Sequence, residues 1–210
     1  MPLLAYCILL DDQPVNFAVE GLLGSKIERI SQSGLIALCS NLDRNSISPA
    51  NFQQAAVEFH RVVQAAFAQK AVVPFRFPTW LSAEEMKAHL HKESSRYSEF
   101  LVRHADHVQM EARIVGRLVS SAPATSGAEH LRARAAQLRA VKEQTREIKN
   151  LVENEAIEWR ERETPDGMRL YALVSKSMVE EFREKLNRAS VHMSGPWPAT
   201  EFFHEQRKED

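Results

Sequence analysis

The chain has 210 residues, of which 44% are apolar, so it is long enough for one large domain or two small ones with real hydrophobic cores. Its 27 basic and 28 acidic residues nearly cancel, which disfavours a protein that attracts nucleic acid or an anionic membrane through an overall positive charge. We therefore expect a globular protein that binds no nucleic acid.

The longest apolar run, Leu3 to Leu10, falls well short of the roughly 20 residues that cross a bilayer. No Lys or Arg precedes it and two acidic residues follow it, which is unlike a signal peptide. We interpret it as a buried strand of a cytoplasmic protein with no membrane partner. Cys7 and Cys39 belong to no Cys-x-x-Cys pair, so we expect two buried thiols and no redox chemistry.

A hairpin and a helix come next in the chain. Ser33 and Gly34 form a turn signal between a loosely alternating stretch, Lys26 to Ile30, and an apolar one, Leu35 to Cys39, which predicts a β-hairpin. Ser48 followed by Pro49 predicts a helix start, because serine caps free N–H groups and proline suits the first turn. Apolar residues then recur on one face of this helix: Phe52, Ala56, Phe59, Val63 and Phe67.

One more strand and one more helix complete the first half. Ala71 to Phe77 predicts a strand, and Pro74 places it at a sheet edge or near a strand end because proline has no N–H to donate. Ser82 and Glu85 form a capping box for a helix that ends near Arg103.

The second half opens with a strand of alternating polar and apolar residues, Val108 to Ile114, whose polar side chains we expect to face water. Ser126 and Glu129 predict the cap of a long helix. A helix that runs to about Glu155 is roughly 45 Å long, so one end should extend beyond the sheet. Its predicted apolar stripe is Leu131, Ala135, Leu138, Val141, Ile148 and Val152.

A hairpin, a helix and a strand end the chain. The strongest turn signal, Thr164 to Gly167, predicts the hairpin, and Ser177 with Glu180 predicts the cap of the last helix. Val191 to Ser194 predicts the final strand.

The order of these elements predicts an α+β fold with two domains. Residues 104–210 read as a modified ferredoxin-like βαββαβ domain with a long helix and a C-terminal tail. Residues 1–103 read as a related or degenerate α+β sandwich, because the first crossover, Asp12 to Ser25, is too short and glycine-broken for a good helix.

Signals for chemistry are missing from the sequence. Histidines at 89, 91, 104 and 107 do not have the spacing of metal ligands, and no phosphate loop, nucleophile elbow or His-Glu-x-x-His motif occurs. An RNA-binding sheet would need exposed aromatic residues, which the 108–114 strand lacks. We expect no catalytic centre, no metal and no cofactor.

Two unusual clusters remain, and each has a structural and a binding interpretation. In the first, an arginine lies among aromatic residues and prolines between Val72 and Trp80. In the second, Ser194 to Pro198, two prolines hold an indole in a rigid turn outside regular structure. Arg and Trp are favoured interface anchors, so the candidate partner-binding residues are Phe75, Arg76, Phe77, Trp80, Trp197 and Phe202.

The same clusters carry a resemblance to a known family. The stretch from Val73 to Phe77 with Thr79, together with the Ser194 to Pro198 stretch and Phe202, resembles the paired signature of the gas vesicle protein L/F family. Pro78 stands where that family usually has glycine, which indicates a divergent member.

The resemblance implies two α+β domains and a non-enzymatic role. It implies an accessory or minor structural protein of gas vesicles that assists assembly by contacting the small hydrophobic shell protein, and other accessory gas vesicle proteins are further expected partners. The expected location is the cytoplasm, at the gas vesicle. The alternative is an α+β adaptor or scaffold protein unrelated to gas vesicles.

Overall fold

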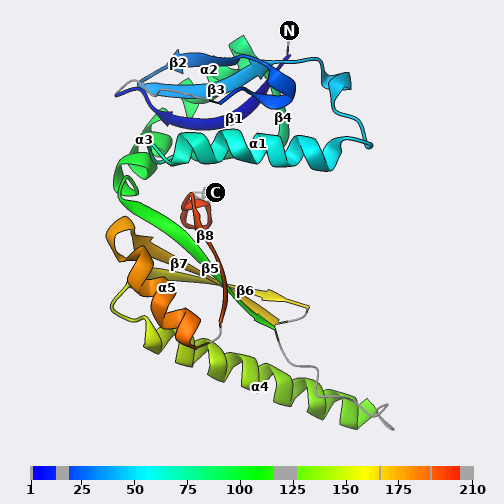
Figure 1. Ribbon diagram of the computed structural model, residues 1–210, viewed down its shortest axis with the longest axis vertical. Helices are drawn as coiled ribbons and strands as arrows, with labels where there is room; N and C mark the ends of the chain where they lie inside the picture. The colour runs from blue at the N-terminus through cyan, green and yellow to red at the C-terminus, as the bar shows by residue number, and fades with distance from the viewer. Residues whose placement is uncertain (1, 13–18, 116–126, 166, 190, 204–210) are drawn as a thin grey trace, which may run out of the picture. The chain divides into compact units, whose positions relative to one another are not determined.

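The computed structural model describes residues 2–12, 19–115, 127–165, 167–189 and 191–203 (Figure 1). The chain divides into two compact units, residues 1–106 and residues 107–210, and each is described by itself. Among the described residues, no helix combines the length and the apolar composition that crossing a membrane requires.

Unit 1 is built on a four-stranded sheet in which each strand is antiparallel to its neighbours, in the order β2-β3-β1-β4. Its strands are β1 (Pro2–Leu10), β2 (Ile27–Gln32), β3 (Leu35–Asn41) and β4 (Val73–Ser82). The β2–β3 hairpin is confirmed, with Ser33 and Gly34 at φ 53° and 77°, the left-handed values that a tight hairpin turn requires. The edge position predicted from Pro74 is also confirmed, because β4 ends the sheet.

Helices cover both faces of this sheet. Helix α1 (Phe52–Phe67) lies along one face and α2 (Ala83–Lys92) covers the other, while α3 (Ser94–Arg103) packs against β1 and β3 (Figure 1). Every residue from Leu3 to Leu9 is buried, as are all residues of β3 except Asn41. Cover on both faces explains why β1 is continuously apolar.

Two helix boundaries differ from the prediction. Helix α1 begins at Phe52 because Asn51 accepts a 2.7 Å hydrogen bond from the N–H of Ser48 and closes a separate turn before the helix. The capping box of Ser82 and Glu85 is confirmed, but the helix it opens stops at Lys92. There the Ser94 hydroxyl donates to the His91 carbonyl at 3.0 Å, so a side chain competes with the helical ladder.

Unit 2 has a sheet of the same strand order, β6-β7-β5-β8, again antiparallel throughout. Its strands are β5 (His107–Val115), β6 (Ala156–Thr164), β7 (Gly167–Ser175) and β8 (His192–Trp197). Helices α4 (Gly127–Leu151) and α5 (Val179–Arg188) pack on one face (Figure 1). The α+β, ferredoxin-like fold is therefore confirmed, and the hairpin predicted at Thr164 to Gly167 joins β6 and β7.

The predicted caps in unit 2 have different outcomes. Ser126 and the side chain of Glu129 lie outside the described residues. The predicted cap at Ser177 is wrong, because Ser177 lies in a short 3-10 turn and its hydroxyl hydrogen-bonds that of Ser175 at 3.0 Å. Helix α5 starts after this turn, at Val179, with no side-chain cap.

Helix α4 extends beyond the sheet, as its length predicts (Figure 1). Val141, Ile148 and Val152 of its predicted stripe are buried. The burial predicted for the first part of the stripe is wrong, because Leu131 and Leu138 are 68% and 42% exposed. Periodicity identified the apolar face of the helix, but not how much of that face the sheet covers.

The second face of the unit 2 sheet carries polar residues and the C-terminal segment. Val108, Met110, Ala112 and Ile114 are buried on the helix side, which confirms the alternation in β5. Gln109, which we expected to face water, is only 5% exposed. Its side-chain oxygen accepts a 2.9 Å hydrogen bond from the N–H of Glu201, in the 3-10 turn η4 (Thr200–Phe202).

Candidate functional site

A long bulge in the edge strand β4 shapes the first candidate site. Pro74 pairs with Cys7 and Thr79 pairs with Ala5, so the four residues 75–78 lie opposite Tyr6 alone. The Thr79 hydroxyl donates a 2.5 Å hydrogen bond to the Arg76 carbonyl across this bulge. Bulges at sheet edges redirect side chains, and this one releases the predicted aromatic cluster from the regular alternation of the strand.

The two phenylalanines of the bulge pack on different helices. The Phe77 ring lies 5.2 Å from the Phe52 ring and 5.1 Å from the Phe59 ring, both on α1. The Phe75 ring lies 6.0 Å from the ring of His89 on α2. Both rings are half-buried, so the bulge is held between the helices while part of its surface stays accessible.

Arg76 lies between them and its side chain is exposed. The interpretation of Arg76 as a structural arginine inside the fold is therefore wrong. The guanidinium is accessible to a partner, where it can form paired hydrogen bonds with a carboxylate or stack on an aromatic ring.

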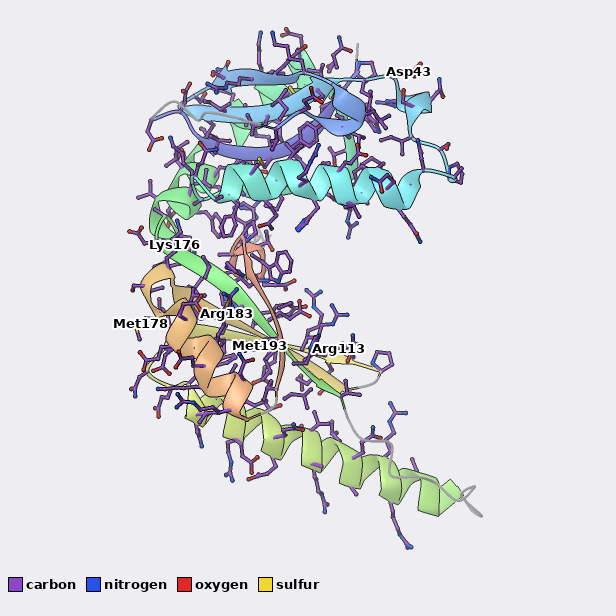
Figure 2. The ribbon with its side chains drawn as sticks, in the orientation of Figure 1. Asp43, Arg113, Lys176, Met178, Arg183 and Met193 are labelled. Carbon is purple, nitrogen blue, oxygen red and sulfur yellow. The ribbon has the colours of Figure 1, made fainter. Side chains whose placement is uncertain are left out.

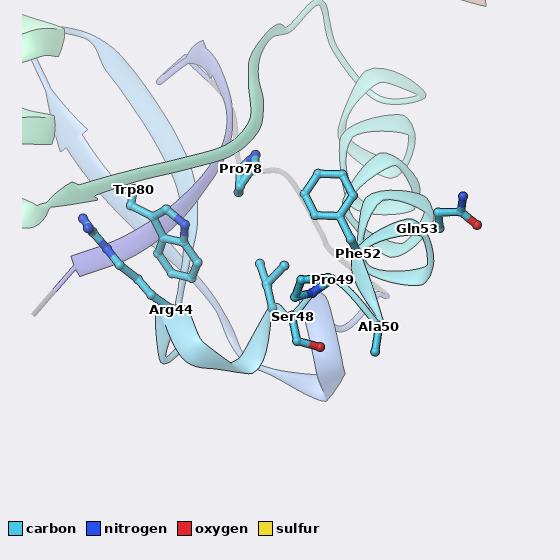
Figure 3. A pocket seen from close by; sticks show the side chains of 9 residues that line it. Arg44, Ser48, Pro49, Ala50, Phe52, Gln53, Pro78 and Trp80 are labelled. Carbon is cyan, nitrogen blue, oxygen red and sulfur yellow. The ribbon is translucent and has the colours of Figure 1, made fainter.

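An open groove of 770 Å³ lies beside the bulge, between the end of β4 and the start of α1. Figure 3 shows Trp80 and Phe52 on opposite sides of this groove, with Pro78 between them. Arg44 adds a positive charge at the Trp80 end, where its guanidinium carbon lies 5.8 Å from the indole centroid. Phe52 is 44% exposed, so the groove presents a substantial aromatic surface to solvent.

The groove brings together residues that are far apart in the sequence. Sequence reasoning identified Trp80 as a candidate but missed Arg44 and Phe52. Phe52 was expected to be buried, because it opens the apolar stripe of α1. The turn before α1 is the signal that could have found it, since a first-turn residue can extend beyond the sheet. No local signal distinguishes Arg44 from other surface arginines.

His89 has a structural role beside this site. Its Nε2 lies 2.9 Å from the Tyr97 hydroxyl, and burial lowers the pKa of the imidazole from its usual value. Burial also raises the pKa of Tyr97. His91 instead contacts the Ser33 hydroxyl through Nδ1 at 3.1 Å, so the two histidines of α2 serve different contacts. Within the described residues, no three His, Cys, Asp or Glu side chains gather in a way that could hold a metal ion.

The second predicted cluster lies in unit 2 and forms part of strand β8. Trp197 pairs with Gln109 and is half-buried, so the prediction that it lies outside regular structure is wrong. Its Nε1 donates to the Ser194 hydroxyl at 3.2 Å. Gly195 adopts φ 121° with its backbone against β5, where an added Cβ would lie 2.9 Å from the Gln109 carbonyl oxygen. Only glycine fits this position well.

Contacts from neighbouring elements fix this end of the chain. Arg183 of α5 reaches β8 and donates a 2.7 Å hydrogen bond to the Gly195 carbonyl (Figure 2). Phe202 is 3% exposed, and the Arg160 guanidinium lies 6.0 Å from its ring. Glu201 pairs with Arg162 at 2.7 Å. Phe202 therefore attaches the C-terminal segment to the sheet, and Trp197 offers the accessible aromatic surface of this cluster.

Comparisons with known proteins agree with this architecture. Residues 2–204 match the family described as "Gas vesicle synthesis protein GvpL/GvpF". The crystal structure of the gas vesicle protein GvpF from Anabaena sp. PCC7120 is similar with a TM-score of 0.81 at 13% identity, covering 97% of this chain and 96% of that chain. GvpF from Microcystis aeruginosa gives a TM-score of 0.80 at 12% identity, covering 97% and 99%. A comparison with curated proteins finds no match.

Proposed function

Because the chain belongs to the family of gas vesicle synthesis proteins GvpL/GvpF, we propose that it is an accessory or minor structural protein of gas vesicles. In this proposal it assists assembly by contacting the small hydrophobic shell protein, in the cytoplasm and at the growing vesicle. Other accessory gas vesicle proteins are its further partners. It acts by protein contact and not as an enzyme.

The observation that carries the proposal is the aromatic groove of unit 1. An apolar shell subunit must be held by apolar surface, because burial of apolar area drives such association. The groove supplies this surface through Phe52, Pro78 and Trp80, and Arg44 adds a positive charge to its lining. The exposed Arg76 adds a second positive charge in the bulge beside the groove. Trp and Arg are the residues that most often dominate the binding energy of interfaces.

The remaining predicted residues receive supporting roles in this proposal. Phe75 and Phe77 hold the bulge in place against α2 and α1. Trp197 is a second, separate contact on unit 2, and Phe202 is buried and holds the C-terminal segment there.

A non-enzymatic role is supported by the two cysteines. Both are buried, and burial raises the pKa of Cys7 and raises that of Cys39 to about 12, so neither forms a reactive thiolate near neutral pH. The chemistry available at the groove and the bulge beside it is instead that of an interface: aromatic surface, the Arg44 guanidinium in the groove and the Arg76 guanidinium in the bulge.

The test is capture of purified shell protein by the full-length chain and its variants. We expect Trp80→Ala to reduce capture strongly and Arg76→Ala to reduce it less, because the indole contributes more apolar contact area. Val102→Ala is the matched control, since Val102 is a 64% exposed apolar residue of α3 outside the groove. Thermal unfolding must first show that each variant folds. If Trp80→Ala and Arg76→Ala both fold and capture shell protein as the parent does, neither the groove nor the bulge beside it is the contact site.

A further inference from the structure

The first half of helix α4 presents an apolar stripe that the described residues of unit 2 leave exposed. Leu131, Ala135 and Leu138 are all exposed, and they follow one another at the four- and three-residue spacing that aligns side chains on a helix. From Val141 onward the helix instead packs on the sheet. We call residues 131–140 the overhanging half of α4; it extends past the sheet in Figure 1.

The charges around this stripe have one sign. The overhanging half contains three basic residues and no acidic one, although the whole chain carries a net charge of −1. All three basic side chains are exposed: Arg132, Arg134 and Arg139. At about 100° per residue, Arg132 and Arg139 lie along one side of the stripe and Arg134 lies along the other. Helix α4 as a whole carries six basic and three acidic residues, and all three acidic residues lie outside the overhanging half.

A shallow groove continues the stripe toward the sheet. It has a volume of 150 Å³ and lies between α4 and the β6–β7 hairpin. Leu138 and Val141 form its apolar side, Pro165 lies opposite, and Arg134 and Glu163 are on its rim. The exposed stripe therefore leads into a hollow that can receive an apolar side chain of a partner.

We propose that the overhanging half of α4 is a docking surface for an acidic amphipathic helix of a partner protein. Apolar residues of that helix cover Leu131, Ala135 and Leu138, and its carboxylates pair with the flanking arginines, as charged residues beside an apolar seam select partners in coiled coils. The inference does not depend on the proposed function, because it concerns a different unit and a partner of different chemistry.

Two other occupants fit the surface less well. A second copy of this chain would bring arginines against arginines along both sides of the seam, and like charges there oppose pairing. An anionic membrane would attract the arginines, but two leucines and one alanine give little apolar area to insert among lipids. An acidic amphipathic helix can both cover the apolar stripe and pair its carboxylates with the flanking arginines.

The test uses two synthetic helical peptides with the same leucine stripe, flanked by glutamates in one and by lysines in the other. Binding to the full-length protein is measured by fluorescence anisotropy at low and high salt. We expect the glutamate peptide to bind and to weaken with salt, and the lysine peptide to bind at least about tenfold more weakly.

Variants separate the stripe from the rest of the helix. Leu138→Ser should weaken binding of the glutamate peptide about tenfold, whereas Leu151→Ser should not change it. Leu151 is a matched control because it lies on the same helix with the same 42% exposure, outside the stripe. Replacing both Arg132 and Arg139 with glutamate should reverse the preference toward the lysine peptide.

Three results would overturn the proposal. The first is equal binding, or no binding, of the two peptides by the folded parent. The second is self-association in sedimentation that Leu138→Ser abolishes, which would assign the surface to a second copy. The third is binding to vesicles of anionic lipid, lost in Leu138→Ser, without binding of the glutamate peptide, which would assign it to a membrane.

Discussion

The two units share one strand order but cover their sheets differently. In unit 1 the connection from β1 to β2 contains the short 3-10 turn η1 (Leu22–Gly24), and two helices follow the fourth strand, β4. In unit 2 the equivalent connection contains the 25-residue helix α4, and only η4 follows β8 among the described residues. Helices thus cover both sheet faces in unit 1, whereas the helices described for unit 2 lie on one face of its sheet.

This difference is visible in the corresponding central strands, β1 and β5. Strand β1 is buried on both faces from Leu3 to Leu9, whereas β5 alternates between buried residues and half-exposed or exposed ones after Met110. A sheet of the same topology therefore needs a continuous apolar strand in one setting and an alternating strand in the other. The period of a strand reports how its faces are covered, and not which fold contains it.

The largest expected effect is the loss of stability caused by polar substitutions at neighbouring positions of β1 and β5, and it tests this contrast. Leu4→Asn and Ala5→Asn in β1 should each lower the free energy of unfolding by about 2–5 kcal/mol, because both side chains are fully buried without polar partners. In β5, Ala112→Asn should behave in the same way. Arg113→Asn, which is exposed, should change stability by less than about 0.5 kcal/mol.

Chemical denaturation of the full-length variants measures these values. If Ala5→Asn is tolerated as well as Arg113→Asn is, the two-sided burial of β1 does not control stability and the contrast fails. A large loss of unfolding free energy in Arg113→Asn would also contradict the contrast, because this position of β5 is exposed.

A smaller effect is expected where unit 1 secures its short β1–β2 connection. The Tyr6 hydroxyl accepts a 2.8 Å hydrogen bond from the buried N–H of Leu22 and donates to the Ser40 hydroxyl at 3.1 Å. Tyr6→Phe should lower the free energy of unfolding by about 1–3 kcal/mol, because it leaves a buried N–H without its acceptor. Tyr171→Phe in unit 2 is the matched control, since Tyr171 is buried but lies on a strand away from any such connection.

Denaturation with urea compares the two tyrosine variants. An equal, small loss in both would mean that the hydroxyl of Tyr6 does not secure the connection. Unit 2 has no need of such a contact, because α4 joins the core through buried apolar residues such as Val141 and Ile148.

The contrast also explains how far the sequence could predict this structure. Local chemistry was sufficient for the Ser82 capping box, the turn at Ser33 and the alternation of β5, because each depends on neighbouring residues. The exposure of Phe52 and Leu138 was missed, because periodicity identifies an apolar face but not where the opposing sheet ends.

The candidate site was predictable only in part, for a related reason. Trp80 and Arg76 stood out as unusual residues within one short stretch. The groove also needs Arg44, which folding brings to Trp80 from a distant turn. Likewise, Gln109 is buried because the C-terminal segment donates a hydrogen bond to it, and no pattern within β5 reveals that contact.

The smallest expected effect is a pH dependence of the stability of unit 1, which arises from His89 on α2. Burial lowers the pKa of His89 on α2; the nearby Glu93 opposes this shift and Lys92 adds to it. In the unfolded chain the imidazole has its ordinary pKa of about 6.5. Between the two pKa values the unfolded state binds more protons than the folded state, so stability should fall as the pH drops from about 7.5 through this interval.

His89→Gln should reduce this loss of stability, because glutamine keeps a polar contact with Tyr97 but does not titrate. Unfolding by urea at about pH 7.5 and about pH 5 measures the difference, with His60→Gln, an exposed histidine of α1, as the control. If His89→Gln and His60→Gln keep the same pH dependence as the parent, the partial burial of His89 on α2 does not control its charge. Helix α2 would then stabilise the sheet face that it covers through packing alone.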